Sequence, residues 1–278
     1  MMLLNVNQCR VSLENAISGR TFKLDISNFR IDSGEAIGIM GKSGAGKTTF
    51  ARFLTGLIKP DAGIVELFDD RLSIGMTFQF PENQFYLNTI YDDIVIGLIE
   101  KGASENDARD HVNSALERVN LQPDEYAHKN HQHLSVGENR RAAIATLLSN
   151  DHDILIFDEP SAGLDGKEIE NLINIFHNLR QEGKTVLIIS QNSEFILETC
   201  ERLVVFDIGK IEYDGSLSEF FFNDELANSY ELEIPPMIKT QLHLNRHFGF
   251  NFEDVIKIEE LKIILDNSLN ITISDSMA

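Results

Sequence analysis

The sequence predicts an α/β fold, in which a parallel sheet is covered by helices and a helical subdomain is inserted into this core. Apolar runs typical of buried strands, at 153–157 and 185–190, alternate with segments of helical periodicity. The stretch from about 80 to 150 is instead largely helical. It separates the first strand–helix unit of the chain from the run at 153–157, so we expect it to form the inserted subdomain.

The N-terminal region is expected to form an antiparallel sheet, because short alternating segments such as 22–26 recur between residues 4 and 31. An apolar run at 36–40 then leads into a glycine-rich turn. We expect a helix after this turn, ended by Pro60. Its apolar face has the spacing i, i+3, i+4, i+7, with Phe50, Phe53, Leu54 and Leu57.

Two further helices are predicted by periodicity and capping signals. The first spans 104–119, where Ser104 and Asp107 can form a capping pair. The second lies between the two buried runs, and Gly183 suits its C-terminal end. Their apolar faces are formed by Ala108, Val112, Ala115, Leu116 and Val119, and by Ile169, Leu172, Ile173, Phe176 and Leu179.

The pattern changes from about Tyr230, which indicates a small C-terminal extension. Pro235-Pro236 is expected to begin one helix, and 252–265 to form another. The run Phe220-Phe221-Phe222 is expected to anchor this extension, because aromatic clusters usually pack in a core. We therefore divide the chain into a main domain at residues 1–227, with the helical subdomain at about 80–150, and an extension at 228–278.

The composition is acidic, with a formal net charge of −20 from 44 Asp and Glu against 24 Lys and Arg. Such a surface repels nucleic acid backbones and favours a basic partner surface. Hydrophobic residues make up 42%, enough for a substantial core. Cys9 and Cys200 lie far apart and are expected to be buried thiols.

No signal peptide is expected, because the first residues lack a basic region followed by an apolar stretch. No apolar run approaches the eighteen or so residues that a membrane span needs. If the protein serves a membrane, we expect it to act from the cytoplasmic side.

The glycine-rich turn is a complete G-x-x-x-x-G-K-[ST] phosphate loop. A strand feeding such a loop into a helix points backbone N–H groups at a phosphate. Lys47 would reach the terminal phosphates, and Thr48 would hold Mg²⁺. We therefore predict a site for a nucleoside triphosphate, formed by Gly41, Lys42, Ser43, Gly44, Ala45, Gly46, Lys47, Thr48 and Thr49.

The run at 153–157 ends in two carboxylates, Asp158 and Glu159. Beside a phosphate loop, the first acid would lie next to Mg²⁺ and the second would act as general base toward the attacking water. The alternative is a strand whose terminal acids are merely solvated. The complete phosphate loop favours the catalytic interpretation.

Two further segments complete a recognisable order of motifs. Leu134-Ser135-Val136-Gly137-Glu138 precedes a helix that contains Asn139-Arg140-Arg141, and Ser161-Ala162-Gly163-Leu164-Asp165 follows the two acids. Over residues 4–225 the chain thus resembles the ATP-binding-cassette (ABC) ATPases, whose nucleotides lie between two subunits. The resemblance implies that Gln79 links the Mg²⁺ site to the helical subdomain and takes part in catalysis. It also implies that Ser135, Gly137 and Asp165 act across a dimer.

A narrower resemblance is to the ATPases of energy-coupling-factor transporters, which import cobalt, nickel or vitamins. It rests on Phe78-Gln79-Phe80-Pro81-Glu82-Asn83-Gln84-Phe85 and, more loosely, on the extension from Glu219 onward. It implies an ATP-hydrolysing subunit on the cytoplasmic face of the membrane. The implied partners are a second ABC ATPase subunit, a transmembrane coupling subunit near Gln84 and a substrate-binding membrane subunit, with no nucleic acid.

The chain departs from the family pattern in two places, after the strand predicted at 185–190 and in the signature segment at 134–138. Gln191 stands where a histidine is usual, and Val136 and Glu138 stand where glycine and glutamine are usual. Gln191 donates a hydrogen bond but carries no charge, so we expect slower turnover rather than none. In this family each nucleotide lies between the phosphate loop of one subunit and the signature segment of the other. Gln191 would therefore affect one such composite site, and Val136 with Glu138 the other. We expect a heterodimer with an ordinary ATPase, with a homodimer as the alternative. A weakly hydrolysing regulatory subunit is a second candidate function.

Other features leave alternatives open. The usual adenine-stacking tyrosine is missing, and Val11 or, as a weaker substitute, Phe22 would pack on the base. The histidine tract before the signature segment is a metal site or a solvated loop, and we favour the loop. A cassette ATPase that acts on ribosomes or DNA is a third candidate, which the acidic composition disfavours. The tract consists of His128, His131 and His133.

Overall fold

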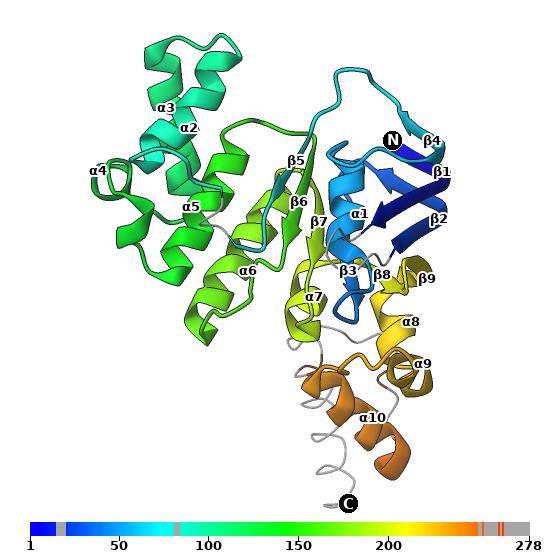
Figure 1. Ribbon diagram of the computed structural model, residues 1–278. Helices are drawn as coiled ribbons and strands as arrows, with labels where there is room; N and C mark the ends of the chain where they lie inside the picture. The colour runs from blue at the N-terminus through cyan, green and yellow to red at the C-terminus, as the bar shows by residue number, and fades with distance from the viewer. Residues whose placement is uncertain (15–20, 81–83, 250–251, 253–260, 262, 264–278) are drawn as a thin grey trace, which may run out of the picture.

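The computed structural model describes residues 1–14, 21–80, 84–249, 252, 261 and 263 of the 278-residue chain. Its centre is a six-stranded sheet with the order β5-β6-β7-β3-β8-β9 (Figure 1). The first five strands in this order are parallel, and β9 is antiparallel to β8. The bounds of these strands are β3 Ala36–Gly41, β5 Ile74–Thr77, β6 Ile154–Asp158, β7 Thr185–Ile189, β8 Arg202–Asp207 and β9 Lys210–Ser216.

A second, three-stranded antiparallel sheet is formed by β1 Met2–Glu14, β2 Thr21–Asp32 and β4 Ala62–Leu67, in the order β2-β1-β4. The predicted N-terminal antiparallel sheet is thus confirmed. One face of the sheet is buried and the other is exposed, in agreement with its alternating sequence pattern.

The central sheet is buried on both faces, because successive side chains of a strand point to opposite sides. Ile154 and Ile156 of β6 pack with helix α1 Lys47–Leu54 and the antiparallel sheet. Leu155 and Phe157 pack with the helices of the opposite face. Those helices are α5 Val136–Leu148, α6 Gly166–Gln181, α7 Ser193–Thr199 and α8 Leu217–Phe221. The predicted α/β core is confirmed.

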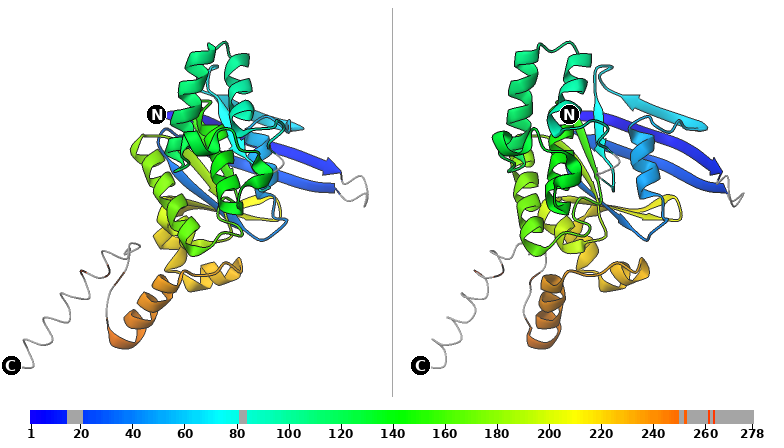
Figure 2. Two further views of the ribbon diagram at one scale, coloured as in Figure 1. Left: turned by 90° about the vertical axis from the view of Figure 1, so that its left-hand side faces the viewer. Right: turned by 60° about the vertical axis from the view of Figure 1, so that its left-hand side comes forward.

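The region between β5 and β6 is helical, as predicted. It forms a lobe that stands beside the sheets (Figures 1 and 2). Ser104 caps the second of its helices through the backbone N–H of Asp107, at 3.2 Å. The elements of this lobe before α5 are α2 Ile90–Glu100, α3 Glu105–Arg118, α4 Pro123–Tyr126 and the 3₁₀ turn η2 His131–His133.

The helix after the phosphate loop is shorter than the sequence predicts. Helix α1 ends at Leu54 with Thr55 as its C-cap, whereas we expected it to reach Pro60. Gly56 follows with φ +75°, a left-handed conformation that suits glycine and ends the helix. Leu57, expected on the apolar face, is therefore 64% exposed.

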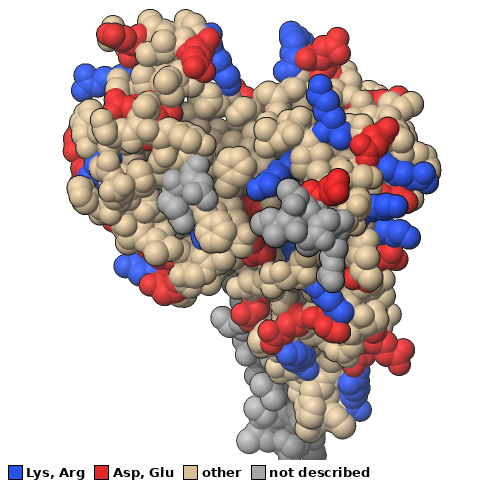
Figure 3. All heavy atoms as spheres, viewed as in Figure 1, with Lys and Arg blue, Asp and Glu red and all other residues tan. Residues whose placement is uncertain are grey.

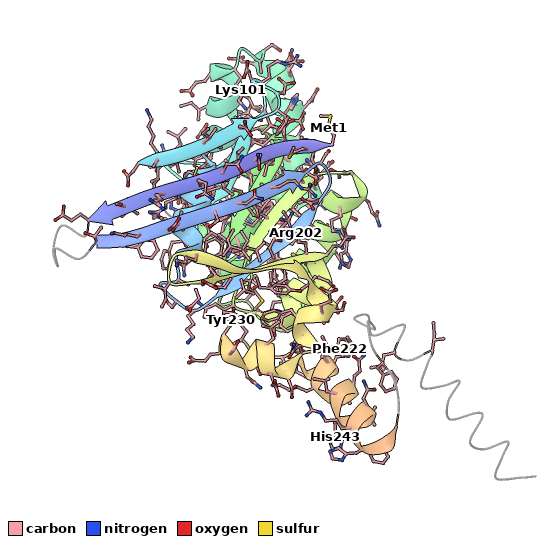
Figure 4. The ribbon with its side chains drawn as sticks, turned by 90° about the vertical axis from the view of Figure 1, so that its right-hand side faces the viewer. Met1, Lys101, Arg202, Phe222, Tyr230 and His243 are labelled. Atoms are coloured by element: carbon pink, nitrogen blue, oxygen red, sulfur yellow. The ribbon has the colours of Figure 1, made fainter. Side chains whose placement is uncertain are left out.

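The C-terminal extension begins with α9 Asp224–Ser229 and α10 Pro236–Phe248. The expected boundary at 227/228 falls inside α9. Phe220 and Phe221 are fully buried just before it, and Figure 4 shows Tyr230 and Phe222 where the extension meets the sheet. Ile238 of α10 joins the same core cluster as the sheet, so the described part of the extension shares the main core. The helix expected at 252–265 lies outside the described residues except for 252, 261 and 263.

Both cysteines are buried and unpaired, as predicted. None of the helices in the described part of the chain combines the length and the apolar character that a bilayer span requires.

Candidate active site

The predicted catalytic segments converge because they follow the carboxyl ends of adjacent parallel strands. The phosphate loop follows β3, Gln79 follows β5, and Gln191 follows β7. Asp158 is the last residue of β6, and Glu159 comes directly after it. Parallel strands end at one edge of a sheet, where ligands of such folds bind. These loops enclose a cleft of about 320 Å³. It is lined by Phe22, Ser43, Gly44, Gly46, Lys47, Thr48, Thr49, Gln79, Asp158, Glu159 and Gln191.

The phosphate loop leads directly into the N-terminus of α1, whose first residue is Lys47. Gly46 precedes it with φ +108°, and a Cβ at this position would lie 2.7 Å from Cζ of Phe22. A larger residue would therefore be strained in its backbone and would also displace Phe22. The loop presents its backbone N–H groups and the positive end of the helix to the cleft, which is a geometry that binds phosphate.

The amine of Lys47 is folded back onto the loop. Its Nζ donates to the carbonyl oxygens of Gly41 at 2.6 Å and Lys42 at 3.0 Å. Burial lowers the pKa of this amine, while the carboxylates of Glu159 and Asp158 act in the opposite direction. Both hydrogen bonds go to neutral acceptors, so the amine can exchange them for phosphate oxygens.

Thr48 and Asp158 form a set of oxygen ligands that fits Mg²⁺. The Thr48 hydroxyl donates to Oδ2 of Asp158 at 2.8 Å. Oδ1 of Asp158 is buried and has no hydrogen-bond partner among the described residues. Burial raises the pKa of this carboxyl, and the Thr48 hydrogen bond partly opposes that rise. A hard cation that prefers oxygen would satisfy the unpaired atom, and Gln79 lines the same cleft.

Glu159 lies just beyond β6 in a left-handed backbone conformation, with φ +51°. Its own N–H donates to the carbonyl of Ile189 at 2.9 Å, and its Oε2 accepts from the backbone N–H of Gln191 at 3.4 Å. Burial is the main cause that raises the pKa of its carboxyl. Raised basicity beside a phosphate loop suits a general base.

Of Val11 and Phe22, the two candidates for packing on adenine, only Phe22 lines the described cleft. Val11 is 2% exposed in the core beneath the antiparallel sheet, so the expectation that it packs on the base is wrong. It lies on the buried face of β1, which the strand alternation places under the sheet. Phe22 lines the cleft next to Gly46 and is the aromatic side chain available there.

The signature segment lies apart from this cleft. Ser135 is the N-cap of α5 and is exposed, and Val136 is 59% exposed. Asp165 is the exposed N-cap of α6, and its side chain accepts from the N–H of Glu168 at 3.0 Å. The described residues that line the cleft include neither Ser135, Gly137 nor Asp165. Within one chain, the structure therefore brings together the phosphate-loop half of the predicted site. The signature half lies outside it, with Ser135 and Asp165 exposed and Gly137 buried at the start of α5.

Glu138 is directed to the helix cap. Its Oε2 accepts from the N–H of Ser135 at 2.8 Å, and Ser135 Oγ accepts from the N–H of Glu138 at 3.2 Å. This reciprocal pair is a capping box. Oε1 accepts from the hydroxyl of Tyr126 at 2.6 Å. The Tyr126 hydrogen bond and then that of Ser135 lower the pKa of Glu138 to about 2. The sequence predicts no role for Tyr126, because nothing in the spacing of the two residues indicates their contact.

Two histidines of the tract and Gln84 make contacts within the helical lobe. His131 stacks on Phe85 with ring centroids 5.2 Å apart, and His128 lies 5.5 Å from Tyr91. In the described part of the chain, no cluster of three or more potential metal ligands forms. Gln84 donates from Nε2 to the carbonyl of Ala143 on α5, at 3.2 Å.

Figure 3 shows basic and acidic side chains interspersed on one face of the molecule, over two lobes with a hollow between them. The lobe of helices α2–α5 and the side with the antiparallel sheet form the two sides of this hollow. The signature segment lies on the helical lobe, and the phosphate loop lies on the other side.

Comparison with known proteins places the chain in a family. Residues 24–162 match the family model described as ABC transporter. The chain is 32% identical to the energy-coupling factor transporter ATP-binding protein EcfA2 of Acetivibrio thermocellus, over 86% of this chain and 89% of that protein. It is 34% identical to EcfA2 of Caldanaerobacter subterraneus subsp. tengcongensis, over 87% and 89% of the two chains.

Solved structures agree with this placement. The fold is similar to cbiO1 of Clostridium perfringens, part of the ABC transporter complex cbiONQ. That match has a TM-score of 0.70 and 26% identity over 86% of this chain and 98% of that chain. It is also similar to the ATP-binding cassette MJ0796, solved as a dimer with ADP and Pi, with a TM-score of 0.69 and 26% identity over 77% and 99%. The chain therefore belongs to the ABC transporter family and is an ATP-binding-cassette ATPase that resembles the energy-coupling-factor transporter ATPases.

Proposed function

We propose that this chain is the ATP-hydrolysing subunit of an energy-coupling-factor-type importer of a metal ion or a vitamin. The observation that carries the proposal is the division of the site. Lys47, Thr48, Asp158 and Glu159 line one cleft, whereas Ser135 lies on the surface of another lobe. Such a chain binds ATP by itself and needs a second subunit to complete the site.

In this proposal, the phosphate loop binds the nucleotide. The backbone N–H groups and the Lys47 amine hold the terminal phosphates, and Phe22 packs on the adenine. Thr48, Asp158 and Gln79 would hold Mg²⁺, and the cation would supply positive charge beside the phosphate oxygens. When ATP binds, the Lys47 amine gives up its hydrogen bonds to the two loop carbonyls and donates to phosphate oxygens instead.

Glu159 serves as the general base in this proposal. Its carboxylate faces the cleft, and the backbone N–H of Gln191 fixes one of its oxygens. The Gln191 side chain is exposed at the cleft and would donate a hydrogen bond to the γ-phosphate or to the attacking water. An uncharged amide stabilises developing negative charge less than an imidazolium would, so this site turns over slowly.

A second ABC ATPase subunit would supply the missing half. Its counterparts of Ser135 and Gly137 would bind the γ-phosphate held by this chain, and its counterpart of Asp165 would contact this chain's site. A solved relative, the ATP-binding cassette MJ0796, is dimeric in a post-hydrolysis state bound to ADP and Pi. Because Gln191 and Val136 would weaken different composite sites, we propose a heterodimer with an ordinary partner.

The membrane partners are proposed from the relatives. The EcfA2 proteins and cbiO1 are components of transporters. The chain would act at the cytoplasmic face of the membrane, with a coupling subunit docked near Gln84 and a separate membrane subunit that recognises the solute. Closure of the ATPase dimer on ATP, and its reopening after hydrolysis, would move the membrane subunits.

A second candidate function is a regulatory subunit that closes on ATP but hydrolyses it weakly. Gln191 in place of histidine favours this candidate. The assembled Lys47, Asp158 and Glu159 favour the catalytic one.

Isolation of the native complex tests the proposed function. The tagged chain is purified from membranes of its host in mild detergent, and its partners are identified by mass spectrometry. The proposal predicts a second ABC ATPase and two membrane proteins in fixed proportion. Recovery of the chain with ribosomes, or as a homodimer without membrane proteins, contradicts it.

A further inference from the structure

Arg140 joins three loops of the site from the signature helix. It lies on α5 five residues beyond Ser135, and it is 7% exposed. Its Nη1 donates to the carbonyl oxygen of Gln79 at 3.0 Å and to that of Glu159 at 2.8 Å. Its Nη2 donates to the carbonyl oxygen of Ala162 at 2.9 Å.

These three acceptors belong to different functional segments. Gln79 follows β5, Glu159 follows β6, and Ala162 lies in the loop that leads to Asp165. A guanidinium presents several N–H donors in a rigid planar fork, so it can hold three carbonyls in a fixed arrangement. A lysine at this position has a single nitrogen and cannot reproduce the fork.

Arg140 contacts the backbone of Glu159 at a residue with an uncommon conformation. Glu159 has φ +51°, a left-handed conformation that is unfavourable for a non-glycine residue. Its N–H is held by Ile189, and its C=O is held by Arg140. The Arg140 charge also lowers the pKa of the Asp158 and Glu159 carboxyls, although burial exceeds this effect for both. The backbone that aims the Glu159 side chain is therefore fixed partly from the signature helix.

We propose that Arg140 is a positioning residue for ATP hydrolysis. Its hydrogen bonds hold the backbones of Glu159 and Gln79 in a fixed position relative to the signature helix α5. The proposal rests on the role of Glu159 proposed above. The fork therefore couples the position of α5 to the backbone of the proposed general base. Arg140 does not line the cleft, so it acts through these backbones and not on the nucleotide.

The test compares Arg140→Gln, Arg140→Lys and a control, Arg118→Lys, in the full chain. Arg118 also joins the helical lobe to the core, through an ion pair with Glu182 at the end of α6, away from the cleft. We expect Arg140→Gln to lower kcat by about 10–100-fold, because misplacement of a catalytic group by about 1 Å has such effects. Its Kd for ATP should stay within about threefold, and Arg140→Lys should recover part of the loss. Arg118→Lys should stay within about twofold of the wild type.

Hydrogen exchange of the segment 157–165 provides a readout that does not require turnover. The N–H of Ala162 donates to the carbonyl of Glu159, so this turn reports on the backbone that Arg140 holds. We expect faster exchange in this segment for Arg140→Gln than for Arg118→Lys, with thermal unfolding confirming that both variants are folded. Unchanged exchange in a folded Arg140→Gln overturns the proposal, as does a kcat within twofold of the wild type. If the wild type hydrolyses no ATP either as a dimer or with an added partner ATPase, the proposed function is in question, while the exchange result still decides the role of Arg140.

Discussion

The two halves of the candidate site are built in different ways. In the phosphate-loop half, Lys47 and Asp158 are buried, and Thr48 bonds directly to Asp158. In the signature half, Ser135 and Val136 are exposed, Gly137 is buried, and a capping box fixes the start of the helix. The first half lines a cleft within the chain, and the second lies outside that cleft, where we propose that a partner subunit docks.

This difference teaches where a substitution acts. A change in the phosphate-loop half alters chemistry in the chain's own cleft. If the proposed dimer forms, a change in the signature half should leave that cleft intact and alter the site of the other subunit. The following predictions separate these two kinds of effect.

The largest effect is expected from Glu159→Gln in the phosphate-loop half. Loss of the general base should cut turnover by about 10²–10⁴-fold, while ATP binding persists. Turnover is measured under saturating Mg·ATP, and retention of ATP is measured by filter binding. Glu194→Gln, an exposed position at the start of α7, serves as the control. Near-normal hydrolysis by Glu159→Gln would remove this residue from its proposed role.

The same residue predicts a pH dependence. Burial raises the pKa of Glu159 above its ordinary value of 4.5, so protonation removes the base as the pH falls through that raised pKa. Turnover of the wild type should therefore fall on the acid side at a pH above 4.5. The residual turnover of Glu159→Gln should lack this dependence, and an identical acid limb in both proteins would assign it to another group.

Val136→Arg tests the signature half. The side chain is 59% exposed, so stability should change by no more than about 0.5 kcal/mol and ATP binding should be unaffected. If a partner docks here, the added charge and bulk should lower turnover by about tenfold or more. Ile64→Arg places the same change on an exposed residue of β4, 60% exposed, as a control. Equal activity of the two variants would contradict docking at the signature.

Gln191→His returns to the phosphate-loop half with a smaller effect. A charge-assisted hydrogen bond exceeds a neutral one by about 1 kcal/mol, which corresponds to about a fivefold gain in turnover. Steady-state hydrolysis at saturating ATP measures it. A loss of activity would show that the cleft is adapted to the amide.

The smallest effect concerns the capping box of the signature half. The folded-state pKa of Glu138 is lowered to about 2 from 4.5. Its carboxylate therefore stabilises the fold above pH 4.5, and this contribution is lost as the pH falls toward 2. Because the side chain is partly exposed, we expect Glu138→Gln to cost about 1 kcal/mol at pH 7 and almost nothing near pH 2. Urea unfolding at several pH values checks this, and a difference that is constant with pH would contradict it.

Much of the fold could be predicted because its signals are local. Ser104 and Asp107 signal the start of a helix three residues apart, and the strand at 153–157 is a short apolar run. The end of α1 was not predicted, because Leu57 continues the apolar spacing and Pro60 is a stronger breaker than Gly56. The competing left-handed conformation of Gly56 ended the helix first.

Candidate site residues could be named from the sequence where they belong to a motif. Contacts between residues far apart in the sequence could not be predicted. The residues of the phosphate loop and Asp158 are in recognisable patterns, whereas Arg140 meets Gln79 across 61 positions of sequence. No spacing rule connects such residues. Val11 was misplaced for a related reason, because the sequence does not show which face of β1 is covered.

The most direct test of the account is ATP hydrolysis by the purified chain across a wide range of protein concentration, with ATP binding and sedimentation measured in parallel. The account predicts that the monomer binds ATP but does not hydrolyse it. Turnover per molecule should appear only where a dimer forms or a partner ATPase is added. Constant turnover per molecule down to concentrations at which only monomer sediments would contradict the claim that the site is completed by a second subunit.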